Sequence, residues 1–423
     1  MDSLTLYVLL VHVSFSFMLS CPVAVQGSSP DAMFVFGDSQ ADVGNNNYIK
    51  TIAMCNVPHY GIDYPGGKPT GRFSNGKNIV DFLVRGSSPA AMFVFGDSLS
   101  DVGNNNYFIT IAKCNFPHYG IDYPGGKPTG RFSNGKNFVD LLAEKLRVPS
   151  PKPYLSLFKT DNPLEFLEGV NFASGSAGIL TSTHQGLCIP LKTQIDFYSL
   201  VFKALVEKLG IFQVQRFISS SILYINIGSN DFQVYDGTCV LTYVRLLVCE
   251  LEGELKRILE LGARKLVFIG TEPVGCWPAV RASNKSPGDC NKEINEASSL
   301  YNEEVVLLLK KLQSEYSDMR YSFFHSYRVF DKFIKHPENY GFNESKAACC
   351  GMGNLNAEFA CNPLAKYCSD RTKYVFWDGW HQTEATANLL VSMAFDGLPP
   401  NVFPVNVREL SGLNAENAHV IDQ

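Results

Sequence analysis

Residues 91–106 read AMFVFGDSLSDVGNNN. The apolar run Met92–Phe95 has the composition of a strand that is buried on both faces, and it ends in the turn residues Gly96, Asp97 and Ser98. A Gly- and Asn-rich stretch follows, and VDLL at 139–142 favours a helix. A strand of this kind is typical of a parallel sheet with helices on both faces. The segment therefore places a serine hydroxyl at the carboxyl end of a buried strand.

The same segment occurs twice. Residues 27–83 begin GSSPDAMFVFGDSQADVGNNNY, and residues 86–142 begin GSSPAAMFVFGDSLSDVGNNNY. A solenoid needs at least three stacked units, and nothing after Leu142 repeats the pattern. One domain offers one slot for such a strand, so the two copies compete for it.

The second copy is the better candidate for that slot because it is contiguous with the remainder of the domain. In the first copy Gln40 replaces Leu99, which puts a polar side chain at an expected core position. We therefore expect residues 28–86 to be a peripheral duplication or a merged gene segment. Ser39 is then a candidate duplicate nucleophile.

Apolar, β-rich runs alternate with helical patterns along the rest of the chain. The predicted strands are 222–227, 265–269 and 320–324, and the predicted helices between them are 242–261 and 295–316. This alternation predicts an α/β fold: a three-layer sandwich with a central, mainly parallel, flavodoxin-like sheet. We expect a single catalytic domain at 87–400 and a C-terminal tail at 401–423.

Polar groups gather where strands of such a sheet end. Ser98 follows one strand and Asn230 another, while Asp378 lies three residues before His381. A serine hydroxyl needs a base to become a nucleophile, and a carboxylate orients the histidine that serves as that base. The sequence predicts Ser98, Asp378 and His381 as a catalytic triad. The predicted oxyanion donors are the backbone N–H groups of Ser98 and Gly175 and the side-chain amide of Asn230.

Four blocks together resemble a known family. GDSLSDVGNNN, GVNFASGSAG, IGSNDF and YVFWDGWHQTEA occur in this order, and the chain from Ser87 to about Leu398 resembles the plant GDSL esterase/lipases of the SGNH hydrolase superfamily. The resemblance implies ester hydrolysis through the triad and oxyanion residues named above. Ser176 stands where the family commonly has glycine, in SGGAG, and Gln382 stands where proline often follows the histidine.

Other interpretations use some of the same residues. Acyl transfer to an alcohol needs the same triad, and a non-catalytic binding or defence protein would retain only the fold. Ser-Gly-Ser-Ala-Gly at 174–178 falls one residue short of the G-x-S-x-G elbow, and no strand is predicted to precede Ser176 as that elbow requires. The substrate is expected to be a small-molecule or lipid ester, and the blocks do not specify which one or the oligomeric state.

The charge and the N-terminal segment indicate which partners and which cellular compartment to expect. A formal net charge of −5 gives no basic face for nucleic acid. Residues 1–27 contain a short apolar run and small residues typical of a signal peptide, with a buried helix or membrane anchor as alternatives. We therefore expect a secreted protein with no integral membrane span after the signal is removed.

The cysteines and sequons agree with secretion. Cysteines cluster late in the chain at spacings that favour disulfides over a zinc site, so we expect neither a metal nor a cofactor. Asn284 and Asn343 begin N-x-S sequons and are predicted glycosylation sites.

Overall fold

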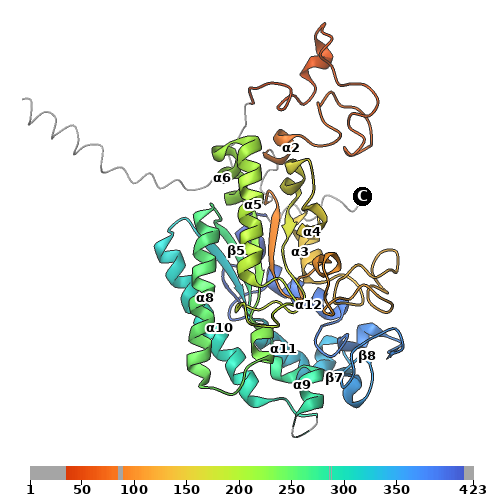
Figure 1. The fold of residues 1–423 in the computed structure, drawn as a ribbon, viewed down its shortest axis with the longest axis vertical. Coiled ribbons are helices and arrows are strands. Elements are labelled where there is room, and N and C mark those ends of the chain that lie inside the picture. Colours follow the sequence, from red (N-terminus) through yellow and green to blue (C-terminus); the bar gives the residue numbers. More distant parts are fainter. Residues whose placement is uncertain (1–34, 84–88, 285, 287, 414–423) are drawn as a thin grey trace, which may run out of the picture. The chain divides into compact units, whose positions relative to one another are not determined.

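The computed structural model describes residues 35–83, 89–284, 286 and 288–413, so the predicted signal peptide at 1–27 lies outside the described residues. A seven-stranded sheet forms the centre of the fold (Figure 1). Its strands pair in parallel except at one edge, where β11 is antiparallel to β6. The order across the sheet is β11 (Val402–Pro404), β6 (Arg320–Phe324), β5 (Lys265–Ile269), β4 (Ile222–Asn226), β1 (Met92–Gly96), β3 (Val170–Asn171) and β2 (Lys152–Pro153). The fold is therefore α/β with a mainly parallel sheet, as predicted.

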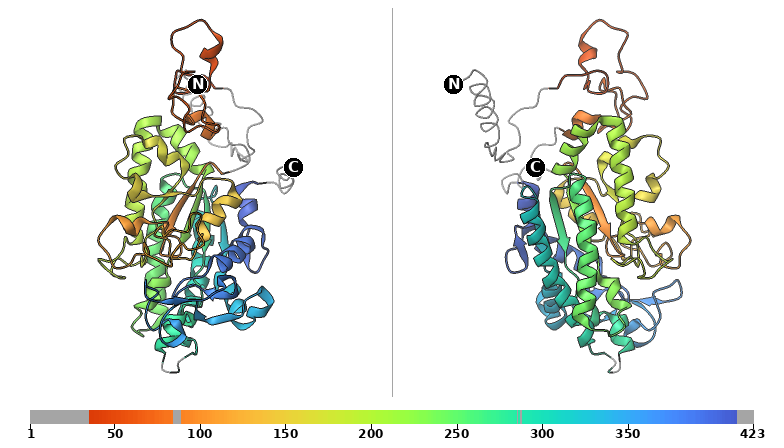
Figure 2. Two further views of the ribbon diagram at one scale, coloured as in Figure 1. Left: turned by 90° about the vertical axis from the view of Figure 1, so that its right-hand side faces the viewer. Right: turned by 60° about the vertical axis from the view of Figure 1, so that its left-hand side comes forward.

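Helices cover both faces of this sheet (Figures 1 and 2). On one face, Phe93 of β1 packs edge-to-face on Tyr198 and Phe217 from two neighbouring helices. On the other, Phe138 packs against Tyr224 of β4. The first face carries α5 (Leu191–Leu209), α6 (Ile211–Ser220), α8 (Val240–Glu260) and α10 (Lys292–Glu315); the second carries α3 (Phe138–Leu146), α12 (Glu384–Asp396) and α13 (Val407–Ser411).

The central strands form where the chain is apolar on both strand faces. All residues of β1 and β4 are buried, because each strand lies between two helical layers. The predicted strands at 222–227, 265–269 and 320–324 are β4, β5 and β6. Helix α3 begins with a capping box, in which the Asn137 side chain accepts from Asp140 N–H and the Asp140 carboxylate accepts from Asn137 N–H.

Shorter elements connect the layers and build the loops at the carboxyl edge. The α-helices are α4 (Tyr154–Leu157), α7 (Ser229–Gln233), α9 (Pro278–Ser283) and α11 (Ser326–Lys335). The small strands are β7 (Glu344–Ala348), β8 (Cys350–Gly351), β9 (Lys366–Tyr367) and β10 (Tyr374–Phe376). The 3-10 helices are η2 (Asn104–Tyr107), η3 (Pro163–Glu168), η4 (Val274–Cys276), η5 (Pro337–Tyr340), η6 (Asn354–Asn356) and η7 (Arg371–Lys373).

The sheet extends beyond the boundary expected from the sequence. Residues 401–423 were expected to form a tail, yet Val402–Pro404 pair with β6 as strand β11. Val407 and Leu410 of α13 are buried in the core. The described part of this segment therefore belongs to the domain, because its apolar residues complete the edge of the sheet.

The first copy of the repeat has its own local structure. Its described elements are η1 (Asn45–Tyr48) and α2 (Ile79–Leu83), and Arg72 forms an ion pair with Asp81. The second copy repeats this pair as Arg131 and Asp140. Over 35–83 the first copy supplies no strand, and its Phe36 is 90% exposed, whereas the equivalent Phe95 of β1 is fully buried.

Candidate active site

Ser98, His381 and Asp378 form a hydrogen-bonded chain. The Nε2 atom of His381 lies 2.8 Å from Ser98 Oγ, and its Nδ1 lies 2.8 Å from both Asp378 Oδ1 and Asp378 Oδ2. His381 and Asp378 are buried, and the Ser98 side chain is half-buried. The structure thus brings the three predicted triad residues into contact. The arrangement fits transfer of the serine proton to the imidazole while the carboxylate orients the ring.

The end of β1 presents Ser98. The Gln194 side chain holds Gly96 from both sides, since its Oε1 accepts from Gly96 N–H at 2.9 Å and its Nε2 donates to Gly96 O at 2.8 Å. Next to it, Asp97 accepts from Leu99 N–H at 3.0 Å, which shapes the turn around the serine. Burial raises the pKa of Asp97 to about 7 despite that hydrogen bond.

A tight turn holds Asp378 and His381. Asp378 Oδ1 accepts from the backbone N–H groups of Trp380 and His381, both at 2.9 Å. The N–H of Trp377 donates to His381 O at 2.7 Å. Burial alone would raise the pKa of Asp378, but the charge of His381 and these hydrogen bonds outweigh burial and lower it. The carboxylate therefore stays ionised beside the imidazole.

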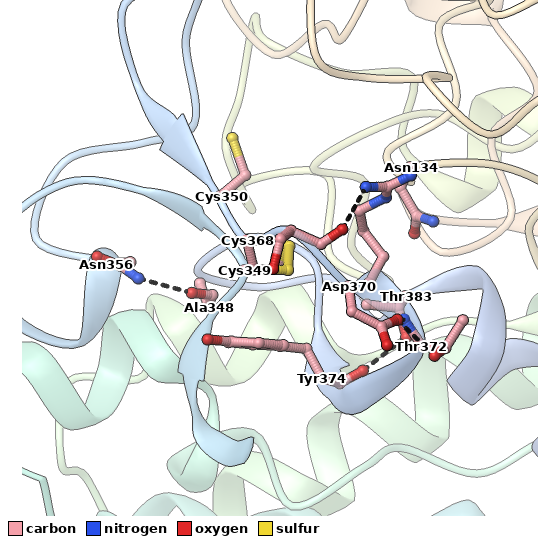
Figure 3. The surroundings of a disulfide bond; sticks show 12 residues. Asn134, Ala348, Cys349, Cys350, Asn356, Cys368, Asp370, Thr372, Tyr374 and Thr383 are labelled. Atoms are coloured by element: carbon pink, nitrogen blue, oxygen red, sulfur yellow. Dashed lines mark hydrogen bonds between the residues drawn. A yellow bond between two sulfur atoms is a disulfide. The ribbon is translucent and has the colours of Figure 1, made fainter. Parts of the chain in front are cut away.

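Two disulfides brace the segment that leads into this turn. Cys349 pairs with Cys368 and Cys350 with Cys361. The N–H groups of Cys349 and Cys350 donate to Phe376 O at 3.0 Å and to Trp377 O at 2.7 Å, immediately before Asp378. Figure 3 shows the Cys349–Cys368 surroundings, where Thr383 Oγ1 donates to Tyr374 O across the same segment. A third disulfide joins Cys276 to Cys290.

In the loop at 174–178, the backbone N–H of Gly175 has a different partner from the oxyanion that was expected. The Gly175 N–H, expected to face an oxyanion, donates to Asp101 Oδ2 at 3.1 Å. By contrast, no acceptor bonds the N–H of Ser176 within the described part of the chain. Ser176 has a φ of +68°, which disfavours a residue with a side chain.

Close packing explains the glycine at 175. A Cβ at this position would lie 2.3 Å from Phe132 Cζ and 2.8 Å from Asn105 Nδ2. The Phe132 ring packs on His381, with ring centroids 5.0 Å apart. The absence of a side chain at Gly175 therefore allows Phe132 to support the histidine.

Asn230 lies on α7, directly after the glycine turn that ends β4. Its Nδ2 donates to Ala177 O at 2.9 Å, and its Oδ1 accepts from Gln233 Nε2 at 2.8 Å. These bonds orient the amide and leave the second N–H of Nδ2 available to another acceptor. Gly228 permits the turn because its φ is +117° and a Cβ there would lie 2.9 Å from Tyr301 Cζ.

Several residues that shape the site were missed in the sequence. Tyr119 donates to Asp378 Oδ2 at 2.6 Å, and Asp101 accepts from Gly175. Burial raises the pKa of Asp101 to about 6, against the effect of its backbone hydrogen bonds. Both residues lie in stretches that the repeat preserves, HYGIDYP and DVGNNN, and this retention is the one signal in the sequence that could have identified them.

Other predicted sites lie outside the triad. Asn343 is exposed, while Asn284 is half-buried and its Nδ2 donates to Asp289 O. Over the described residues, no group of three or more His, Cys, Asp or Glu side chains is arranged to hold a metal. A cavity of about 770 Å³ has Trp380 and Gln233 in its lining, but none of the predicted triad or oxyanion residues lines it.

The fold and site define a class before any comparison. A serine, a histidine and a carboxylate linked at the carboxyl edge of a three-layer α/β sheet have the arrangement of a serine-dependent hydrolase. Residues 92–393 match the family described as GDSL-like Lipase/Acylhydrolase. The chain belongs to this family and is an ester-bond hydrolase.

Relatives from Arabidopsis thaliana cover most of the chain. One GDSL esterase/lipase is 43% identical over 323 residues, which are 73% of this chain and 86% of the relative. A second is 36% identical over 352 residues, covering 80% of this chain and 95% of the relative. GDSL esterase/lipase 7 is 37% identical over 348 residues, with 76% and 92% covered.

Proposed function

We propose that the protein is a secreted carboxylic-ester hydrolase in which Ser98 is the nucleophile, His381 the general base and Asp378 the residue that orients it. The observation that carries this proposal is the unbroken chain of 2.8 Å contacts from Ser98 Oγ through His381 to Asp378. The reaction begins when Ser98 Oγ attacks the ester carbonyl and His381 Nε2 takes the serine proton.

The remaining steps follow from the same geometry. His381 returns the proton to the departing alcohol, and an acyl-enzyme on Ser98 remains. Water then attacks this acyl group, with His381 again acting as base, and the acid is released. The proposed substrate is a small-molecule or lipid ester, as suits a member of the GDSL-like lipase and acylhydrolase family.

The proposed oxyanion hole consists of three N–H donors. Ser98 contributes its backbone N–H and Asn230 its remaining side-chain N–H. We assign the third donor to Ser176 rather than Gly175, because the Gly175 N–H is already bonded to Asp101. Such a donor contributes about 3 kcal/mol to stabilising the transition state.

Secretion and glycosylation complete the proposal. Three disulfides are typical of an oxidising compartment. In the described chain, no helix has both the length and the apolar character needed to cross a membrane. The exposed Asn343 is the better of the two proposed glycosylation sites, since its side chain faces solvent.

A matched pair of serine variants tests the proposal. Purified wild type, Ser98→Ala and Ser39→Ala are assayed on p-nitrophenyl esters of increasing acyl length. Loss of hydrolysis in Ser98→Ala with full activity in Ser39→Ala is the expected result. Labelling of Ser39 by a serine-directed phosphonate, with Ser98 unlabelled, would overturn the assignment. The preferred chain length then ranks the ester substrates.

A further inference from the structure

Tyr119 is a buried residue whose hydroxyl contacts Asp378 of the proposed triad. Its O–H donates to Asp378 Oδ2 at 2.6 Å, and the residue is only 4% exposed. The oxygens of Asp378 have different partners: Oδ1 accepts from the backbone N–H groups of Trp380 and His381, whereas Oδ2 accepts from the Tyr119 hydroxyl, and His381 Nδ1 lies 2.8 Å from both oxygens. Besides His381, Tyr119 is therefore the side chain that bonds Oδ2.

The hydroxyl remains a donor throughout the working range of an esterase. Burial, followed by the nearby charge of Asp378, raises the pKa of Tyr119 well above its ordinary value. The neighbouring Cys114 thiol also interacts with the Tyr119 hydroxyl, and burial raises the pKa of that thiol. Both groups stay protonated, so the hydrogen bond to Asp378 persists as the pH changes.

The duplicated segment provides an internal comparison. In the first copy, Tyr60 interacts with Cys55 as Tyr119 does with Cys114. The tyrosine–cysteine pair is thus a property of the local loop sequence. The hydrogen bond to Asp378, by contrast, joins Tyr119 to a residue 259 positions further along the chain, so it depends on the fold and not on the local loop sequence.

We propose that Tyr119 is a positioning residue for ester hydrolysis, which fixes the Asp378 carboxylate and thereby the His381 ring. The inference rests on the proposed function, in which Asp378 orients His381. Without the hydroxyl, Oδ2 would accept from His381 alone, and only the bonds to Oδ1 would resist a turn of the carboxylate about its Cβ–Cγ bond. Nδ1 of His381 bonds both oxygens, so such a turn would also move the imidazole relative to Ser98 Oγ.

The hydroxyl also determines how much negative charge the carboxylate presents to the histidine. A hydrogen bond from Tyr119 withdraws charge from Oδ2, so its loss strengthens the attraction between Asp378 and the protonated imidazole. The protonated, inactive form of the base is then favoured up to a higher pH. The acid limb of the kcat/KM profile therefore moves to higher pH in Tyr119→Phe.

Phenylalanine is a suitable probe because it keeps the packing. The Tyr119 ring lies edge-to-face with Phe116 at 5.2 Å and with Trp377 at 6.2 Å between centroids, and the variant retains both contacts. The only group removed is the hydroxyl. Tyr60→Phe makes the same chemical change in the duplicate loop and serves as the matched control.

The test compares full-length wild type, Tyr119→Phe, Tyr60→Phe and Ser98→Ala by thermal unfolding and by p-nitrophenyl ester kinetics across pH. Tyr119→Phe is expected to lose about ten-fold in kcat, the effect of one hydrogen bond to a charged group, with KM within about two-fold. Its acid limb moves to higher pH, while Tyr60→Phe matches wild type. The rate of phosphonate labelling of Ser98, followed by mass spectrometry, reports the same loss without substrate turnover.

The outcomes separate the two proposals. Activity retained by Ser98→Ala would refute the proposed function itself. An inactive Ser98→Ala together with a folded Tyr119→Phe of unchanged kcat and pH profile would refute only the positioning role. Equal losses in Tyr119→Phe and Tyr60→Phe would also refute it, because Tyr60 belongs to the duplicate loop. If Tyr119→Phe unfolds at a lower temperature, kinetics measured below that transition still decide the question through the acid limb.

Discussion

Adding a methyl group at Gly175 should disable the enzyme by way of Phe132. An alanine Cβ would lie 2.3 Å from Phe132 Cζ, 2.6 Å from Phe132 Cε2 and 2.8 Å from Asn105 Nδ2. Atoms cannot approach so closely, so the ring or the loop must shift. Phe132 is buried and packs on His381, and Asn105 is held by Gly175 O and Ala112 O.

The magnitude follows from these contacts. Overpacking of a tight core costs about 1–3 kcal/mol in the free energy of unfolding, and a ring trapped against His381 places this site at the upper end. A displacement of the histidine by roughly 1 Å lowers the catalytic rate by about a hundred-fold. Gly175→Ala is therefore expected to lose both stability and kcat.

The adjacent residue provides a control with the opposite expectation. Ser176 has a φ of +68°, so Ser176→Gly removes strain of about 1–2 kcal/mol. Glycine also adds about 0.5–1 kcal/mol of unfolded-state entropy, which leaves a net gain between zero and about 1.5 kcal/mol. The backbone N–H that we assign to the oxyanion hole is kept, and activity should persist.

Thermal unfolding and p-nitrophenyl butyrate hydrolysis measure both variants. The reasoning predicts a lower melting temperature and kcat for Gly175→Ala, and an equal or higher melting temperature for Ser176→Gly with kcat close to wild type. A Gly175→Ala protein with wild-type melting temperature and kcat would show that Phe132 adapts without moving His381.

Four further changes have expected outcomes. Asn230→Ala should fold normally and lose about a hundred-fold in kcat, as for removal of one oxyanion donor; an unchanged kcat would make it a turn residue. Deleting residues 28–86 should give an active enzyme of higher soluble yield, and an inactive product would make the first copy a part of the domain. Replacing Cys349 and Cys368 by alanine should lower the free energy of unfolding by about 3 kcal/mol, measured by denaturant titration, and should lower kcat by loosening the Asp378 turn. Burial raises the pKa of Glu272 from 4.5 to about 8, so the folded state binds the carboxyl proton more tightly than the unfolded state does. The free energy of unfolding therefore falls as the pH rises from about 4.5 through 8. In Glu272→Gln, thermal unfolding measured across this pH range should show a smaller fall.

Much of the fold was readable from local sequence. The runs at β4, β5 and β6 were predicted because the four or five successive buried residues of each strand are mostly apolar, and the helices between them showed apolar residues at helical spacing. The edge strand β11 was not predicted, since Val402–Pro404 is short, contains a proline and owes its strand to pairing with β6. Ser98, Asp378 and His381 were proposed from motif and spacing.

The sequence by itself determined the local units: the loop turns, the Arg–Asp ion pairs and the tyrosine–cysteine contacts, which form in both copies because neighbouring residues build them. The sequence also favoured the second copy as the source of β1, whereas only the tertiary structure decided which tyrosine contacts Asp378. The tertiary structure also decided that the Gly175 N–H bonds Asp101, 74 residues away. These contacts join segments that are far apart in the chain, so no local pattern specifies them. The sheet has one strand position between β3 and β4, and of two near-identical segments it takes the one that can be buried there together with the other strands.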